Sequence, residues 1–89
     1  MVQKTLKIIN EKGLHARASA KLVEVVEGFD ATAEVSRDGL WASGDSIMGL
    51  LMLAASKGTT IDVTTSGPDA EALASALDAL VADKFGEGY

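Results

Sequence analysis

The residues best suited to chemistry lie in one short run, GLHAR at residues 13–17, which contains the only histidine of the chain. This run lies where a glycine turn meets a predicted helix, whose first amide groups carry about half a positive charge and stabilise an anion. A phosphoryl group on His15 would lie in that field, which also disfavours a protonated imidazole and so favours a neutral, nucleophilic His15. Because Arg17 can bind phosphoryl oxygens with its planar set of donors, phosphoryl transfer is one candidate activity.

Two other interpretations of this run stay open on chemistry alone. In the first, which the residues alone slightly favour, His15 simply begins or packs near the helix while Arg17 is a solvated side chain. In the second, His15 activates Ser19, which lies four residues later on the same helical face. A nucleophilic serine also needs an orienting acid and an oxyanion hole, and nothing in the sequence places either.

The chain has 89 residues, of which 47% are hydrophobic and 24% charged, as in an ordinary globular domain. This length fits a single domain over residues 1–89 and leaves little room for a deep pocket. The formal net charge of −5 argues against nucleic acid as a partner, because phosphate backbones need clustered Lys and Arg. Five of the eight basic residues fall within the first 21, so a basic corner remains for a small anion.

The composition also limits cofactors and location. The chain has no cysteine and one histidine, so we expect no disulfide, no metal site and no cofactor. Lys4 and Lys7 interrupt the N-terminal stretch that would have to form an export signal. The longest apolar run, residues 47–55, is well short of the roughly 18 residues that a membrane span needs. We expect a soluble, cytoplasmic monomer that does not bind membranes.

The elements that position the histidine follow from periodicity and turn signals. Alternating polarity predicts strands at residues 2–9, 32–36 and 59–66, and Arg37-Asp38-Gly39-Leu40 predicts a two-residue hairpin turn into a further strand. Helices are predicted from Ala16 to Gly28, from residue 47 to Lys57-Gly58 and after residues 67–69, with the chain fraying beyond Phe85. The order β-α-β-β-α-β-α predicts an α+β fold with three helices on one face of a four-stranded, mainly antiparallel sheet.

A second candidate is Ser46, which opens the apolar run at residues 47–53. A serine here is typical of a helix N-cap, and a phosphate is also favoured at a helix N-terminus, so capping and regulatory modification both stay open. Residues 39–46 come close to the phosphate-loop pattern of nucleotide-binding proteins, but Asp45 stands where that pattern needs a lysine. An acid there would repel nucleotide phosphates, so we reject nucleotide binding.

The run at residues 13–17 closely resembles the active-site signature of HPr, the histidine-containing phosphocarrier family of the bacterial phosphoenolpyruvate-dependent phosphotransferase system. Residues 46–50 resemble the regulatory serine site of that family, and the resemblance covers essentially the whole chain, including its length and element order. It implies the family fold, an open-faced β-sandwich. It also implies a protein that is not an enzyme in the usual sense, since such a carrier holds the phosphoryl group covalently and is the substrate of its partners.

The resemblance further implies roles for individual residues. His15 would accept a phosphoryl group from Enzyme I as a pros-phosphohistidine, linked through Nδ1, and pass it to an Enzyme IIA-type protein, with Arg17 steadying the group. Ser46 would be phosphorylated by HPr kinase/phosphorylase. Partners would dock on a patch in which methionine gives an adaptable surface, formed by Ala16, Ala20, Ile47, Met48 and Leu51.

Two positions depart from the family pattern. Ala18 stands where many members have proline, and residues 18–20 are similar to members of the nitrogen-related regulatory branch rather than of sugar import. Asp45 stands where members with a serine switch commonly have a basic residue, and its charge would oppose phosphorylation of Ser46. Two other functional classes stay open: a regulatory binding module controlled at Ser46, and a small-ligand-binding domain, for which the sequence reveals no pocket.

Overall fold

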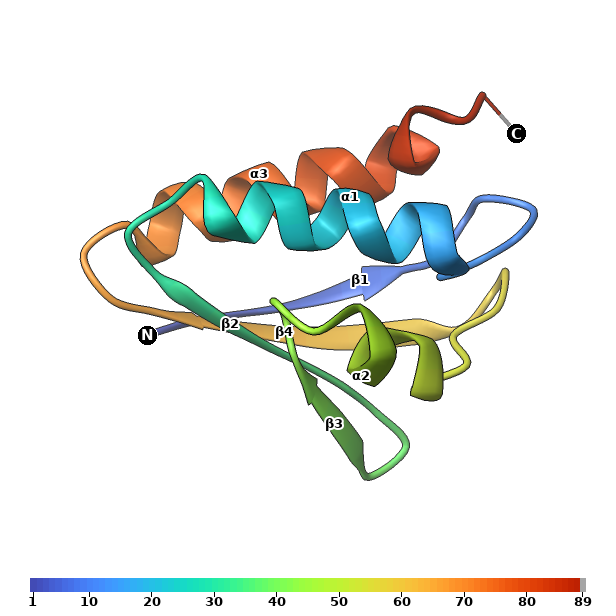
Figure 1. Cartoon of the computed structure of the whole chain (residues 1–89), viewed down its shortest axis with the longest axis horizontal. Helices are drawn as coiled ribbons and strands as arrows, with labels where there is room; N and C mark the ends of the chain where they lie inside the picture. Colours follow the sequence, from blue (N-terminus) through green and yellow to red (C-terminus); the bar gives the residue numbers. More distant parts are fainter. Residues whose placement is uncertain (89) are drawn as a thin grey trace.

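The computed structural model describes residues 1–88 and has the element order predicted from the sequence (Figure 1). Within those residues, four strands form one antiparallel sheet in the order β1-β4-β2-β3. The predicted α+β fold is confirmed. The elements are β1 (Val2–Lys7), α1 (Ala16–Glu27), β2 (Thr32–Arg37), β3 (Leu40–Ser43), α2 (Ile47–Met52), β4 (Thr60–Ser66), α3 (Ala70–Ala82) and the short 3-10 helix η1 (Lys84–Gly86).

The helices cover one face of the sheet. Helices α1 and α3 lie side by side in opposite directions, and α2 packs against α1 and β3 (Figure 1). The start of α1 and the end of α3 therefore meet at one end of the molecule. The other face of the sheet is mostly polar, as the hydrogen bond from the Thr5 hydroxyl to the Asp62 carboxylate at 2.7 Å illustrates. The exception is Trp41 of β3, which pairs with Ser36 on this face and is 68% exposed.

The buried face results from alternation along the strands. Leu6 of β1 pairs with Ile61 of β4, and these side chains are 6% and 0% exposed. Cross-strand apolar pairs of this kind fix the register, because a shift by one residue would turn them towards solvent. Lys4 falls in the same phase but lies at the margin, where its ammonium group is 3.3 Å from a carboxylate oxygen of Asp78 in α3.

Two local predictions are confirmed. Asp38 and Gly39 both have positive φ, 50° and 82°, as a two-residue turn between antiparallel strands requires. Helix α1 ends with Gly28 as its C-cap. The helix buries one face, formed by Ala18, Ser19, Leu22, Val23 and Val26.

Helix α2 is shorter than predicted, because it ends at Met52 rather than at Lys57-Gly58. Leu53 and Ala55 are both buried, at 1% and 3% exposure. In an α-helix, side chains two positions apart point in directions about 200° apart around the helix axis. A helix that continued through Leu53 and Ala55 could therefore not turn both side chains into the same core. Ala54 adopts a left-handed φ of 52° and takes the chain out of the helix.

The prediction that the chain frays beyond Phe85 is wrong for Gly86 and Glu87, whose amides donate to the carbonyl oxygens of Asp83 and Lys84 at 2.9 and 3.1 Å. Residue 89 lies outside the described residues. Phe85 is fully buried, and the backbone turns there through left-handed φ values of 54° at Lys84 and 56° at Phe85. Burial of a whole aromatic side chain contributes about 1.5–3 kcal/mol, which helps to offset that backbone strain. The Lys21 ammonium group of α1 also donates to the Phe85 carbonyl oxygen at 2.7 Å. This turn carries Glu87 back towards the start of α1.

Gly13 brings the loop before α1 against the segment that follows α2. It has a φ of 62°, and a Cβ atom on it would lie 2.4 Å from the carbonyl oxygen of Ala55. The amide of Leu14 donates to that same oxygen at 2.8 Å. This close approach of two backbones determines where α1 begins.

We predict that Gly13→Ala lowers the free energy of unfolding more than Gly39→Ala does. Both positions have positive φ, which costs an L-residue about 1–2 kcal/mol. A Cβ atom on Gly39 meets nothing within 4 Å, whereas one on Gly13 collides with Ala55. Urea unfolding of the parent and both variants measures the difference, and equal losses would contradict a role for the close approach.

Candidate functional site

His15 occupies the last position before α1, as the sequence predicts. Its backbone is extended, with φ −79° and ψ −176°. Its carbonyl oxygen accepts a helical hydrogen bond from the amide of Ser19 at 2.8 Å. About a quarter of the side chain, 26%, is exposed. The imidazole therefore stands beside the first turn of the helix and can be reached from solvent.

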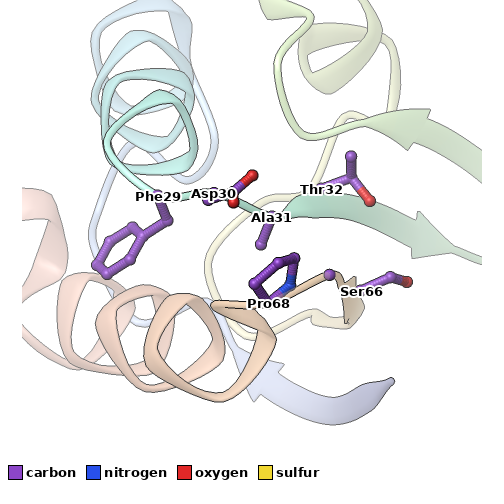
Figure 2. A pocket seen from close by; sticks show the side chains of 7 residues that line it. Phe29, Asp30, Ala31, Thr32, Ser66 and Pro68 are labelled. Atoms are coloured by element: carbon purple, nitrogen blue, oxygen red, sulfur yellow. The ribbon is translucent and has the colours of Figure 1, made fainter.

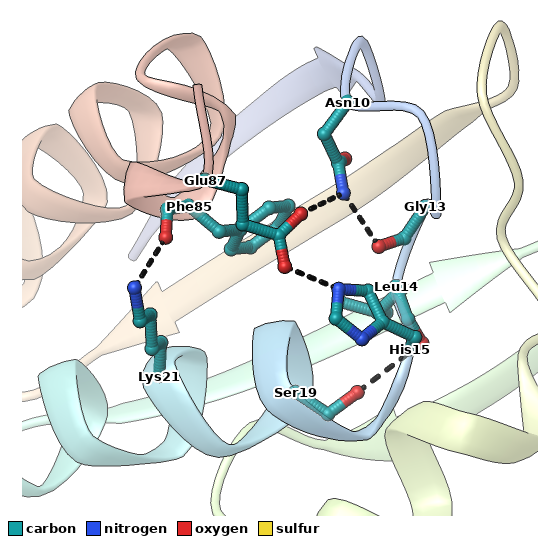
Figure 3. A network of polar contacts seen from close by, with 8 residues as sticks. All are labelled: Asn10, Gly13, Leu14, His15, Ser19, Lys21, Phe85 and Glu87. Carbon is teal, nitrogen blue, oxygen red and sulfur yellow. Dashed lines mark hydrogen bonds and ion pairs between the residues drawn. The ribbon is translucent and has the colours of Figure 1, made fainter. Parts of the chain in front are cut away.

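Ser19 is not placed to act as a nucleophile with His15. Its side chain is fully buried, and its hydroxyl donates to the carbonyl oxygen of Leu14 at 3.3 Å (Figure 3). A serine that attacks a substrate needs a free, accessible oxygen and a base that accepts its proton. The interpretation in which His15 activates Ser19 is therefore not supported by the geometry.

The imidazole instead contacts Glu87, which lies 72 residues later in the chain. Nε2 of His15 and Oε2 of Glu87 form a hydrogen bond, and Oε1 of Glu87 accepts a second bond from the Asn10 amide nitrogen at 3.0 Å (Figure 3). The same Asn10 nitrogen donates to the carbonyl oxygen of Gly13 at 2.8 Å. One polar network thus joins the loop before α1, the histidine and the end of the chain.

The Glu87 carboxylate is held in its ionised form. Its side chain is only 2% exposed, and burial by itself raises its pKa. The hydrogen bond from Asn10, the hydrogen bond and charge of His15, and the charge of Arg17 together outweigh burial, so the pKa of Glu87 lies below its ordinary value. An ionised carboxylate only accepts hydrogen bonds, so the proton in the His15 contact belongs to Nε2.

The remaining groups around the ring suit an anion. With Nε2 bound to Glu87, the other ring nitrogen, Nδ1, lies on the side of the ring away from that carboxylate (Figure 3). Arg17 follows two residues later, is exposed and forms no ion pair within residues 1–88. A group attached to Nδ1 would lie beside the start of α1, and the Arg17 guanidinium, whose charge also acts on Glu87, is a further source of positive charge in the site.

Sequence reasoning missed Glu87 and Asn10. The two glycines in the tail after α3 predict fraying, and Asn10 stands in a run before Gly13 that is typical of a turn. Phe85 is the signal in the sequence that could have indicated an ordered tail, because a large apolar side chain is usually buried. Its burial is what anchors the segment that carries Glu87.

The residues predicted to dock partners lie on α1 and α2, which pack against each other. Met48 is 70% exposed and Ile47 40%. Ala16 is exposed, while Ala20 and Leu51 are partly exposed. Met52, at 75% exposure, adds an apolar side chain that the prediction did not include. An apolar surface of this kind next to His15 suits contact with another protein.

Ser46 is the N-cap of α2. Its hydroxyl oxygen accepts a hydrogen bond from the amide of Gly49 at 3.1 Å, and the side chain is partly exposed. The neighbouring Asp45 accepts a hydrogen bond from the Ser43 hydroxyl at 2.5 Å and is exposed. The capping role of Ser46 is confirmed, and the acid beside it remains a negative charge next to any phosphate placed there.

A surface hollow of about 390 Å³ lies at the opposite end of α1, between the start of β2 and the turn into α3 (Figure 2). Asp30 is the charged residue among those that line it, and no basic side chain lines it. It therefore offers nothing that would attract a phosphoryl group.

Among residues 1–88, no cluster of three or more His, Cys, Asp or Glu could hold a metal ion. No helix in this described part is long and apolar enough to span a bilayer.

The sequence matches known proteins over nearly its whole length. A family model described as "PTS HPr component phosphorylation site" matches residues 2–83. The phosphocarrier protein HPr of Cupriavidus necator is 48% identical over 88 residues, which cover 99% of each chain. The phosphocarrier protein NPr of Escherichia coli K12 is 40% identical over 87 residues, which cover 97% of each chain.

Solved structures give the same result for the fold. The crystal structure of HPr-C-His from Thermoanaerobacter tengcongensis has a TM-score of 0.93 and 36% identity, covering 98% of each chain. The crystal structure of the phosphocarrier protein HPr from Bacillus anthracis has a TM-score of 0.86 and 39% identity, covering 90% of this chain and 95% of the other. The architecture is therefore that of solved phosphocarrier structures.

The depressed pKa of Glu87 predicts how stability depends on pH. A carboxylate whose folded-state pKa lies below its unfolded value of 4.5 stabilises the fold above that pH and loses this contribution as the pH falls through the folded value. Glu87→Gln removes the titrating group. We therefore predict that the parent loses more free energy of unfolding than Glu87→Gln between about pH 5 and pH 3, measured by urea unfolding at each pH.

Glu27→Gln is the matched control, because Glu27 is an exposed residue at the far end of α1. This variant should follow the parent across the same pH range. If Glu87→Gln also followed the parent, the Glu87 carboxylate would not be stabilised by its partners in the folded state.

Proposed function

The chain belongs to the HPr family of phosphocarrier proteins of the phosphotransferase system, and from that premise we propose that His15 carries the phosphoryl group. The supporting observation is the position of His15 at the start of α1, partly exposed and with Nε2 bound to a buried carboxylate. A neutral imidazole held in this way has one lone pair to offer, on Nδ1. The pros-phosphohistidine implied by the sequence is the product expected from this arrangement.

Arg17 and the first turn of α1 are proposed to stabilise the phosphoryl oxygens. The first amides of a helix attract anions, and the guanidinium group can donate two parallel hydrogen bonds to a phosphoryl group. Arg17 is exposed, so its side chain can move towards a group on His15. It then acts as a counter-charge to the transferred group.

Enzyme I is the proposed donor, and an Enzyme IIA-type protein of the nitrogen-related branch is the proposed acceptor. The exposed residues Ile47 and Met48 support docking, because they lie on α2 beside the helix that His15 begins. Residues 18–20 support the nitrogen-related branch through the resemblance described above. The protein would accordingly be a substrate of both partners and would catalyse no reaction alone.

The direct test is to incubate the protein with Enzyme I and phosphoenolpyruvate. We expect the parent to gain one acid-labile, base-stable phosphoryl group, detected by intact-mass spectrometry before and after acid treatment. His15→Ala should gain none, because the chain has no other histidine. Adding Enzyme IIA-type acceptors of the two branches separately should remove the group faster with the nitrogen-related acceptor.

Ser46→Ala serves as the control in this experiment and should still gain the acid-labile group. Circular dichroism confirms that each variant is folded before its phosphorylation is compared. If His15→Ala accepted phosphate as well as the parent, His15 would not be the phosphoryl carrier.

Ser46 is proposed as a second, regulatory phosphorylation site. Its hydroxyl caps α2, so a phosphate attached there would lie at a helix N-terminus next to the exposed Ile47 and Met48. A charge in the middle of an apolar docking surface would weaken contact with Enzyme I. Asp45 opposes the modification, so the proposal depends on a kinase that tolerates this acid.

Ser46→Asp and Ser46→Asn separate charge from capping, because both side chains cap a helix but only aspartate is charged. We predict that Ser46→Asp slows phosphorylation of His15 by Enzyme I about tenfold or more relative to Ser46→Asn. HPr kinase/phosphorylase with ATP should modify the parent but not Ser46→Ala. Equal rates for the aspartate and asparagine variants would remove the basis for regulation at this position.

A further inference from the structure

We propose that Glu87 is a positioning residue that makes Nδ1 of His15 the phosphoryl-accepting atom and stabilises the positively charged ring formed by transfer. This inference rests on the proposed function of His15. The geometry that supports it is the contact between Oε2 of Glu87 and Nε2 of His15 (Figure 3). A carboxylate at that nitrogen keeps the proton on it and blocks access to it, so Nε2 can neither attack phosphorus nor be approached by a donor.

The carboxylate is held firmly enough to orient the ring. Its side chain is 2% exposed, and its second oxygen accepts a hydrogen bond from Asn10, which is fully buried. The chain on the other side is fixed by the buried Phe85, whose carbonyl oxygen accepts a hydrogen bond from Lys21. A site residue supported on both sides by packing and hydrogen bonds keeps its partner in one orientation.

The transfer step balances without moving a proton. The Nδ1 lone pair forms the new bond to phosphorus, and the bond between phosphorus and the donor atom breaks, with its electron pair remaining on the donor. The ring then carries a phosphoryl group on Nδ1, a proton on Nε2 and a net positive charge. When the group leaves for the acceptor, the electron pair of the P–N bond returns to Nδ1 and the ring is neutral again.

Glu87 faces the charge that appears in this step. The positive ring lies between the negative phosphoryl group and the carboxylate, so the charge-assisted hydrogen bond at Nε2 strengthens on phosphorylation. Other charged groups in the segments that pack together here are Lys12, Arg17, Lys21, Asp83 and Lys84, together with Glu11 and Lys57, which form an ion pair at 3.5 Å. Of these, Arg17 acts on the carboxylate by its charge, while the Lys21 ammonium group is bound to the Phe85 carbonyl oxygen.

The experiment uses the full chain and two variants at the proposed position. Glu87→Gln keeps the shape and an acceptor oxygen but removes the charge, and Glu87→Ala removes the carboxylate altogether. Glu27→Gln is again the control for loss of an exposed glutamate. Thermal unfolding followed by circular dichroism establishes that each variant is folded.

The first readout is the identity of the phosphorylated nitrogen. Each protein is treated with phosphoramidate, a small phosphoryl donor that imposes no docking geometry, and the linkage is assigned by phosphorus–proton correlation NMR. We expect Nδ1-linked phosphohistidine in the parent and Glu27→Gln, and an Nε2-linked fraction at least about tenfold larger in Glu87→Ala. An unchanged ratio in Glu87→Ala would show that Glu87 does not select the nitrogen.

The second readout is the pH at which the phosphorylated ring loses its Nε2 proton, followed by ³¹P NMR after phosphorylation by Enzyme I. We expect this midpoint to fall by about one pH unit or more in Glu87→Gln relative to the parent and Glu27→Gln, because the carboxylate charge is gone. A purely structural role would leave the midpoint unchanged, and that result would overturn the stabilising role of the charge.

These outcomes separate failure of this inference from failure of the proposed function. If the parent takes no phosphoryl group on His15 from Enzyme I, the proposed function fails and this inference fails with it. If the parent is phosphorylated on Nδ1 but the Glu87 variants match it in both linkage and midpoint, only the role of Glu87 is overturned.

Discussion

Burial of one face of the sheet is the constraint from which the site follows. Apolar residues such as Leu6 and Ile61 alternate with polar ones along the strands, so one face needs a cover and the other does not. Helices α1 and α3 supply that cover and run in opposite directions (Figure 1). Their arrangement brings the beginning of one helix and the end of the other to the same place. His15 and Glu87 meet there because the two helices that cover the core are antiparallel. The fully buried Phe85 also holds the end of the chain in place.

The electrostatics of the site follow from the same arrangement. The start of α1 is the positive end of its dipole, and Glu87 brings a negative charge to it from the segment after α3. The buried carboxylate remains ionised because Asn10, His15 and Arg17 all favour its charged form. Its negative charge would repel a phosphoryl group brought close to it, but the imidazole lies between the two. In the proposed phosphorylated form the ring would therefore separate two anions, because Glu87 lies on the Nε2 side and Nδ1 on the side that faces away from it (Figure 3).

The sequence predicts those features of the fold that depend on interactions between residues close together in the chain. The hairpin followed from Asp38 and Gly39, which tolerate positive φ, and the placement of His15 at the start of α1 followed from periodicity and a preceding turn. The end of α2 could not be predicted in this way, because the burial of Ala55 against the loop before α1 decides it. The contact between Glu87 and His15 joins residues that are 72 positions apart, and no pattern within a single element predicts it.

A phosphoryl carrier must release its group as readily as it accepts it, and the structure divides these needs between two parts of the site. The ring is positioned by buried groups, since Glu87 and Asn10 are almost wholly excluded from solvent. The groups on the other side are open, since Arg17 is exposed and His15 is 26% exposed. A closed cage of donors would bind the phosphoryl group tightly and would exclude the next protein from an in-line approach. Rigid support behind the ring and open access in front of it would keep the histidine oriented without trapping the phosphoryl group that we propose it carries.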